Sequence, residues 1–73
     1  MEKLAIYTSH IRLDQAMKLA SFVASGAEAK TLVQEGAVLV NGAVCTQRGK
    51  KLFNGDYFSV GDMEARISST VEE

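Results

Sequence analysis

The sequence predicts an α+β fold in which two short helices pack on a small antiparallel sheet. Apolar residues recur at helical spacing in two early segments, and later segments alternate apolar and polar residues as strands do. Turn signals of the Asn-Gly and Gly-Asp kind separate the strand-like segments. Because the helices follow one another and the short strands then follow in sequence, the helices should cover one face of the sheet.

The first element is expected to be a short strand over residues 3–8, which are rich in apolar residues. The polar residues after it, including His10, are expected in a solvated loop. A helix is predicted over residues 13–24, with Asp14 near the positive end of the helix dipole. Its apolar stripe consists of Leu13, Ala16, Met17, Ala20 and Val23, and Leu19 and Ala24 widen it.

A second, capped helix is predicted to begin at Ser25. The Ser25 hydroxyl should accept a free amide of the first turn, and the Glu28 carboxylate should reach back to the Ser25 amide. Gly36 is expected to end this helix in the left-handed conformation. An alternating run follows, and Asn41-Gly42 supplies the favoured two-residue hairpin turn.

The remainder reads as short strands and turns. A return strand is expected over residues 43–46, and the lone Cys45 is interpreted as a small strand residue. The segment 47–51 is basic with a central glycine, and residues 54–56 form a turn signal. A second hairpin is predicted about Gly61-Asp62, with arms over 57–60 and 63–67. The acidic tail, residues 68–73, is expected to be frayed.

Length and composition limit the protein to a single domain over residues 1–73. One cysteine and one histidine can form neither an internal disulfide nor a zinc site. No apolar run approaches the ~18 residues of a membrane span and no signal peptide is evident, so a soluble cytoplasmic protein is expected. The formal net charge is −1, but residues 10–53 hold six Lys or Arg against three Asp or Glu. Such local clustering governs binding to a polyanion.

The sequence contains no catalytic constellation, so an enzyme with a small-molecule substrate or cofactor is not expected. The candidate site is a basic surface on the two predicted helices and on the glycine-containing loop after the hairpin, with Lys18 on the first helix and Lys30 on the second. Flexible amines and a guanidinium near exposed backbone suit contact with phosphates, and Gly49 would let the chain approach closely. This set consists of Lys18, Lys30, Arg48, Gly49, Lys50 and Lys51.

Three stretches in the same order resemble the αL RNA-binding motif of the ribosomal protein S4 family, across roughly residues 10–60. They are IRLDQAMKLA, SGAEAKTLVQEGAVLVNG and QRGKKLFNGD. The spelling is most similar to the small stand-alone bacterial YaaA/YbcJ-type members. The resemblance implies two helices on a small sheet, with ribosomal or transfer RNA as the partner and the ribosome as a place of binding.

The family's basic contacts fall on Arg12 and on the five Lys and Arg residues of the candidate site. Related sequences often have two arginines before the loop glycine, whereas Gln47 occupies the first position here. This departure could weaken the affinity or alter the partner. Binding should rely on shape and backbone, because A-form RNA hides its major-groove edges.

Two alternatives remain open. A helix-turn-helix DNA-binding protein would place Glu28, Lys30, Thr31 and Gln34 in the major groove. The second helix is short for that role and carries an acid near the probing end. A protein-interaction module would dock a partner through exposed edge strands or apolar residues.

Overall fold

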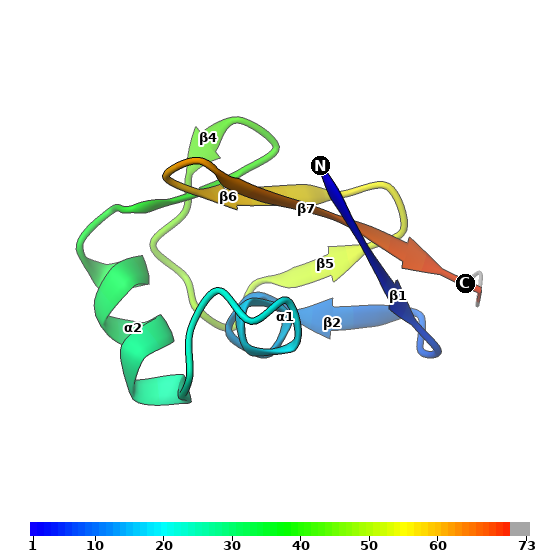
Figure 1. Ribbon diagram of the computed structural model, residues 1–73, viewed down its shortest axis with the longest axis horizontal. Coiled ribbons are helices and arrows are strands. Elements are labelled where there is room, and N and C mark those ends of the chain that lie inside the picture. The colour runs from blue at the N-terminus through cyan, green and yellow to red at the C-terminus, as the bar shows by residue number, and fades with distance from the viewer. Residues whose placement is uncertain (71–73) are drawn as a thin grey trace.

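Two short helices lie on one side of a five-stranded sheet in the computed structural model, which describes residues 1–70 (Figure 1). In chain order the elements are β1 (Glu2–Ile6), β2 (His10–Arg12), α1 (Leu13–Leu19), α2 (Gly26–Gln34), β3 (Val38–Val40), β4 (Ala43–Val44), β5 (Lys51–Phe53), β6 (Tyr57–Val60) and β7 (Met63–Ser69). The predicted α+β class is therefore confirmed.

The main sheet is mixed, whereas an antiparallel sheet was predicted. Its strand order is β1-β7-β6-β3-β4, and β1 runs parallel to β7 while the other pairs are antiparallel. A separate antiparallel pair, β2 with β5, lies beside α1 (Figure 1). Neither the β1–β7 nor the β2–β5 pairing has a local signal, because each joins strands that lie far apart in the sequence.

The core lies between the helices and one face of the main sheet. Phe58 is the largest fully buried side chain, and its ring lies 5.4 Å from the Phe22 ring. The helices contribute the apolar stripe that the sequence predicted, with Leu13 and Met17 fully buried. Leu19 differs from the prediction, since 55% of its surface is exposed.

Helix α1 ends at Leu19, five residues before the predicted end at residue 24. Ser21 lies in the left-handed region with φ of 63°, and the Phe22 amide donates to the Met17 carbonyl at 2.9 Å. This is the hydrogen-bond pattern of a glycine-type helix end, built here on a serine. The end was missed because the sequence offers no glycine at that point.

Helix α2 begins as predicted, with one change of partner. The Glu28 amide donates to the Ser25 hydroxyl at 3.2 Å, which confirms the cap. The Glu28 carboxylate accepts from the Ala24 amide at 3.0 Å, and not from the Ser25 amide as predicted. At the other end Gly36 has φ of 75°, as expected of a helix stop.

The two predicted hairpins are present. Asn41 and Gly42 both have positive φ, 51° and 87°, as the two-residue hairpin turn requires. The return strand β4 is shorter than predicted, and Cys45 lies just beyond it, buried, with its amide bonded to the Val38 carbonyl at 3.0 Å. In the second hairpin β6 pairs with β7 about Gly61-Asp62.

The frayed tail was predicted to begin at residue 68, but β7 continues to Ser69. Ser68 and Ser69 belong to β7 and pair with Ala5 and Ile6 of β1. The Ser69 amide also donates to the Asn54 side-chain oxygen at 2.9 Å. These long-range bonds extend the strand beyond its apolar residues. Residues 71–73 of the predicted tail lie outside the described residues.

Candidate nucleic-acid interface

The basic loop is attached to the N-terminus of α1 by its own backbone. The Leu13 amide donates to the Lys50 carbonyl at 2.8 Å, and the Asp14 amide donates to the Arg48 carbonyl at 3.0 Å. The N-cap residue Arg12 makes no side-chain cap, so these two carbonyls satisfy amides that the helix itself leaves without partners. The Lys50 amide closes the turn on the Gln47 carbonyl at 3.1 Å.

This anchoring leaves the charged side chains of the loop in solvent. Arg48, Lys50 and Lys51 are exposed. Because the loop backbone is held by hydrogen bonds, the Cα positions from which these cationic side chains extend are fixed. The sequence predicted a basic segment with a central glycine, whereas the structure has a turn whose backbone is bonded to a helix.

Arg12 joins the loop from the neighbouring strand. It pairs with Lys51 across β2 and β5, and residues paired across two strands lie on the same face. Its guanidinium also donates to the Asp14 carboxylate at 3.1 Å, and its side chain remains 49% exposed. We call Arg12, Arg48, Lys50 and Lys51 the basic loop cluster.

Gly49 lies against the Arg12 guanidinium. A Cβ atom built on Gly49 would lie 3.7 Å from an Arg12 nitrogen, which is an ordinary contact. The backbone of Gly49 is not in the left-handed region, so no conformational requirement demands glycine. Its small size instead leaves the Arg12 side chain uncovered.

No strand pairing or side-chain bond among residues 1–70 connects Lys18 or Lys30 to the basic loop cluster. Lys18 is exposed in the last turn of α1, four residues after Asp14 and thus on the same side of the helix. Lys30 is exposed on α2. Neither lysine has an ion-pair partner among residues 1–70. The structure therefore brings together four of the six predicted cations, together with Gly49.

The pairing of β2 with β5 reveals two residues that the sequence did not single out. His10 and Phe53 pair across the strands, and their ring centroids lie 5.6 Å apart. The predicted solvated loop at His10 is thus wrong, because His10 is a half-buried strand residue. No sequence signal could have joined these rings, since the strands pair only in the tertiary structure.

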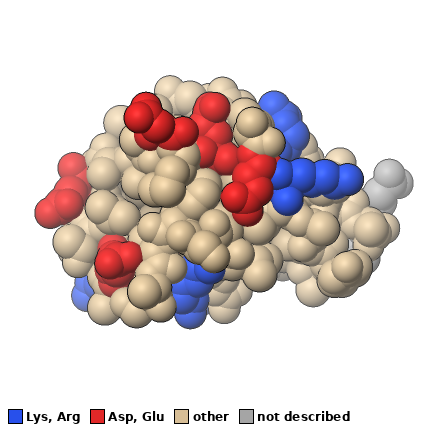
Figure 2. Space-filling view, in the orientation of Figure 1, with Lys and Arg blue, Asp and Glu red and all other residues tan. Residues whose placement is uncertain are grey.

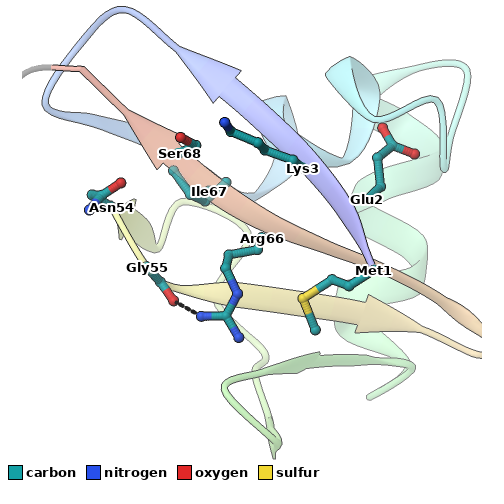
Figure 3. A pocket seen from close by; sticks show the side chains of 8 residues that line it. All are labelled: Met1, Glu2, Lys3, Asn54, Gly55, Arg66, Ile67 and Ser68. Atoms are coloured by element: carbon teal, nitrogen blue, oxygen red, sulfur yellow. Dashed lines mark hydrogen bonds between the residues drawn. The ribbon is translucent and has the colours of Figure 1, made fainter.

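A second pair of basic residues, Lys3 and Arg66, lies at the β1 edge of the main sheet. Lys3 pairs with Arg66 beside a groove of about 340 Å³, which Asn54, Gly55 and Ser68 also line. Figure 3 shows the Arg66 side chain extending to the Gly55 carbonyl, to which it donates at 2.8 Å, while Glu2 points away. Arg66 also lies over the Tyr57 ring at 5.3 Å.

Charge on the surface is mixed. Figure 2 shows Lys and Arg side chains interspersed with Asp and Glu on the face drawn there, with no single basic field across it. Local clusters, and not the overall charge, must therefore attract an anion.

Among the described residues, no group of three His, Cys, Asp or Glu side chains could hold a metal ion. None of the helices in this part of the chain is long and apolar enough to cross a membrane.

Comparisons with known proteins agree with this fold. A family model described as the S4 domain matches residues 4–68. The probable ribosome maturation protein RlbA of Bacillus subtilis (strain 168) is 40% identical over 57 residues, which cover 78% of this chain and 80% of that protein. The solution structure of YbcJ from E. coli has a TM-score of 0.72 and 30% identity, covering 93% of this chain and 87% of that one. YbcJ is described as having an αL motif involved in RNA binding.

Proposed function

This chain belongs to the S4 domain family, and on that premise we propose that it binds structured RNA without catalysing a reaction. Ribosomal RNA is the favoured class, because a relative with 40% identity is named a probable ribosome maturation protein. Transfer RNA is the second class. The ribosome in the cytoplasm is then the natural place of action. We assign the function to the single domain of residues 1–73, with the motif core at 10–60.

The observation that carries this proposal is the basic loop cluster on the N-terminus of α1. The carbonyls of Arg48 and Lys50 accept hydrogen bonds from helix amides, and Arg12 and Lys51 pair across β2 and β5. The four cationic side chains therefore extend from a fixed backbone. Arg and Lys side chains held in this way suit the phosphates and 2′-hydroxyl groups of an RNA backbone. We include Lys18 and Lys30 as outer contacts that an RNA across the helices would reach.

Binding to DNA through a helix-turn-helix is less well supported. In that alternative Glu28 would probe the groove, but its carboxylate is bonded to the Ala24 amide. A carboxylate used as a helix cap supplies no base contact and adds repulsion from phosphates. The basic loop, moreover, is joined to α1 and not to the second helix.

A competition experiment tests the proposal. A labelled folded RNA is bound to the protein and displaced by unlabelled folded RNA or by duplex DNA of equal length. RNA should compete far better than DNA. The affinity should also fall with salt, with a log–log slope of roughly −3 to −3.5 if the four cations of the cluster each contact a phosphate.

Equal competition by DNA would move the helix-turn-helix alternative to first place. No binding of either nucleic acid at low salt would favour the protein-interaction module instead.

A further inference from the structure

An aromatic pair and a basic pair share one exposed face of the β2–β5 ribbon. The strands pair His10 with Phe53 and Arg12 with Lys51, and the residues between them, Ile11 and Leu52, turn toward the core. Because side chains alternate along a strand, the aromatic and basic pairs lie on the opposite face. We call these four side chains the ribbon face.

The aromatic pair is not required by the core. Leu52 is fully buried and fills the inner side of β5, whereas Phe53 is 38% exposed. The Phe53 and His10 rings contact one another with their planes tilted by 46°, and Phe53 is exposed while His10 is half-buried. Exposed aromatic rings beside cations are a common platform on which nucleic-acid bases stack.

The basic pair is placed to hold the phosphate of the same nucleotide. Arg12 and His10 are two residues apart on one side of β2, so they are separated by roughly 7 Å along the strand. A nucleotide spans such a distance from base to phosphate. The Arg12 guanidinium is oriented by its bond to Asp14 at 3.1 Å, and Gly49 leaves it uncovered.

The neighbouring acids are already engaged. Asp14 is bonded to Arg12 and has only 14% of its side chain exposed. Asp56 accepts from the Phe53 amide at 2.8 Å and from the Asn41 side chain at 3.2 Å. Both carboxylates therefore serve backbone or side-chain donors of the protein itself, which reduces their repulsion of a phosphate.

We propose that the ribbon face binds an unpaired nucleotide, with its base stacked on Phe53, His10 against the edge of the base, and its phosphate on Arg12 and Lys51. In a duplex both faces of a base are covered by its neighbours, so an exposed ring can stack only on an unpaired base. The chain should then prefer RNA in which an unpaired base adjoins a helix that lies on the basic loop cluster. This inference rests on the proposed function, which is RNA binding.

The experiment compares three labelled RNA hairpins by fluorescence anisotropy. One stem is fully paired, one carries a single bulged nucleotide, and one carries the same bulge as an abasic sugar. The unaltered protein should bind the bulged hairpin about tenfold more tightly than the paired stem, as one stacked base allows. The abasic hairpin should bind like the paired stem.

Two variants at one position assign the preference to the ring. Phe53→Leu should lose the preference for the bulge and keep the parent affinity for the paired stem. Phe53→Tyr retains a ring and should keep the preference. Thermal unfolding of each variant verifies the fold, and the abasic comparison needs no variant at all.

The outcomes separate this inference from the proposed function. Equal affinity of the parent for paired and bulged hairpins, or a folded Phe53→Leu variant that keeps the preference, overturns the ribbon-face assignment and leaves RNA binding intact. The aromatic pair would then be available to a protein partner instead. If the parent binds none of the three RNAs at low salt, the proposed function fails together with the inference.

Discussion

The Leu13 amide donates a 2.8 Å hydrogen bond to the Lys50 carbonyl, and this bond joins the first turn of α1 to the basic loop. The bond uses only backbone atoms. The side chains of the loop can therefore be changed without removing the attachment, which makes charge and fold separable in this region. The first two predictions depend on that separation.

Replacing Lys50 and Lys51 by glutamate should weaken RNA binding strongly. The slope of log affinity against log salt should become shallower, by the amount that roughly two lost phosphate contacts predict. The free energy of unfolding should change by no more than about 0.5 kcal/mol, because both side chains are exposed and neither forms an ion pair in the described structure. Salt titrations and urea unfolding of the double variant measure the two effects. Lys3→Glu serves as the charge control, since Lys3 lies on β1 outside the cluster. If the double variant folds and binds like its parent, the basic loop cluster is not the interface.

Gly49→Val should weaken RNA binding by covering Arg12. A Cβ at this position would lie 3.7 Å from the guanidinium, and the two further methyl groups of valine would extend over it. Gly49→Ala should have a smaller effect, and neither change should strain the backbone because φ is not left-handed. Affinities of the two variants for one folded RNA, measured side by side, provide the comparison. Parent affinity in the valine variant would show that Arg12 does not need to be uncovered.

Ser25→Ala should destabilise the domain by about 1 kcal/mol, because the Glu28 amide loses the hydroxyl that it donates to at 3.2 Å. RNA binding should persist under conditions where the variant is folded. The midpoint of urea unfolding measures the change. Thr46→Ala is the matched control, since Thr46 is exposed and its hydroxyl makes no hydrogen bond among residues 1–70. Identical midpoints for the parent and Ser25→Ala would contradict the cap.

Ser21→Gly should stabilise the domain by about 0.5 kcal/mol. Serine at a φ of 63° carries the steric cost of the left-handed region, which glycine avoids, although glycine also loses more chain entropy on folding. Ser21→Val should destabilise it by more than 1 kcal/mol, since a β-branched side chain is worst at positive φ. Thermal unfolding of the pair gives the sign of each change. Stabilisation by valine would contradict the left-handed helix end at residue 21.

Local signals predicted the second helix and the two hairpins well. Ser25 and Gly36 act through atoms within a few residues, and Asn41-Gly42 sets its turn by backbone conformation alone. The same local reasoning failed at the end of α1, because Ser21 adopts a conformation that its type does not favour. The burial of Val23, and of Phe22 against Phe58, offsets the steric cost of the left-handed conformation at Ser21.

By itself the sequence determined which residues carry positive charge, where α2 begins and ends, and that an α+β fold of S4 type should result. Only the tertiary structure decided that the basic loop caps α1, that Arg12 lies beside Gly49, and that His10 meets Phe53. The reason is physical. Caps and turns are stabilised between neighbours in the chain, whereas the β2–β5 and β1–β7 pairs are selected by how distant segments bury Ile11, Leu52 and Ile67 together.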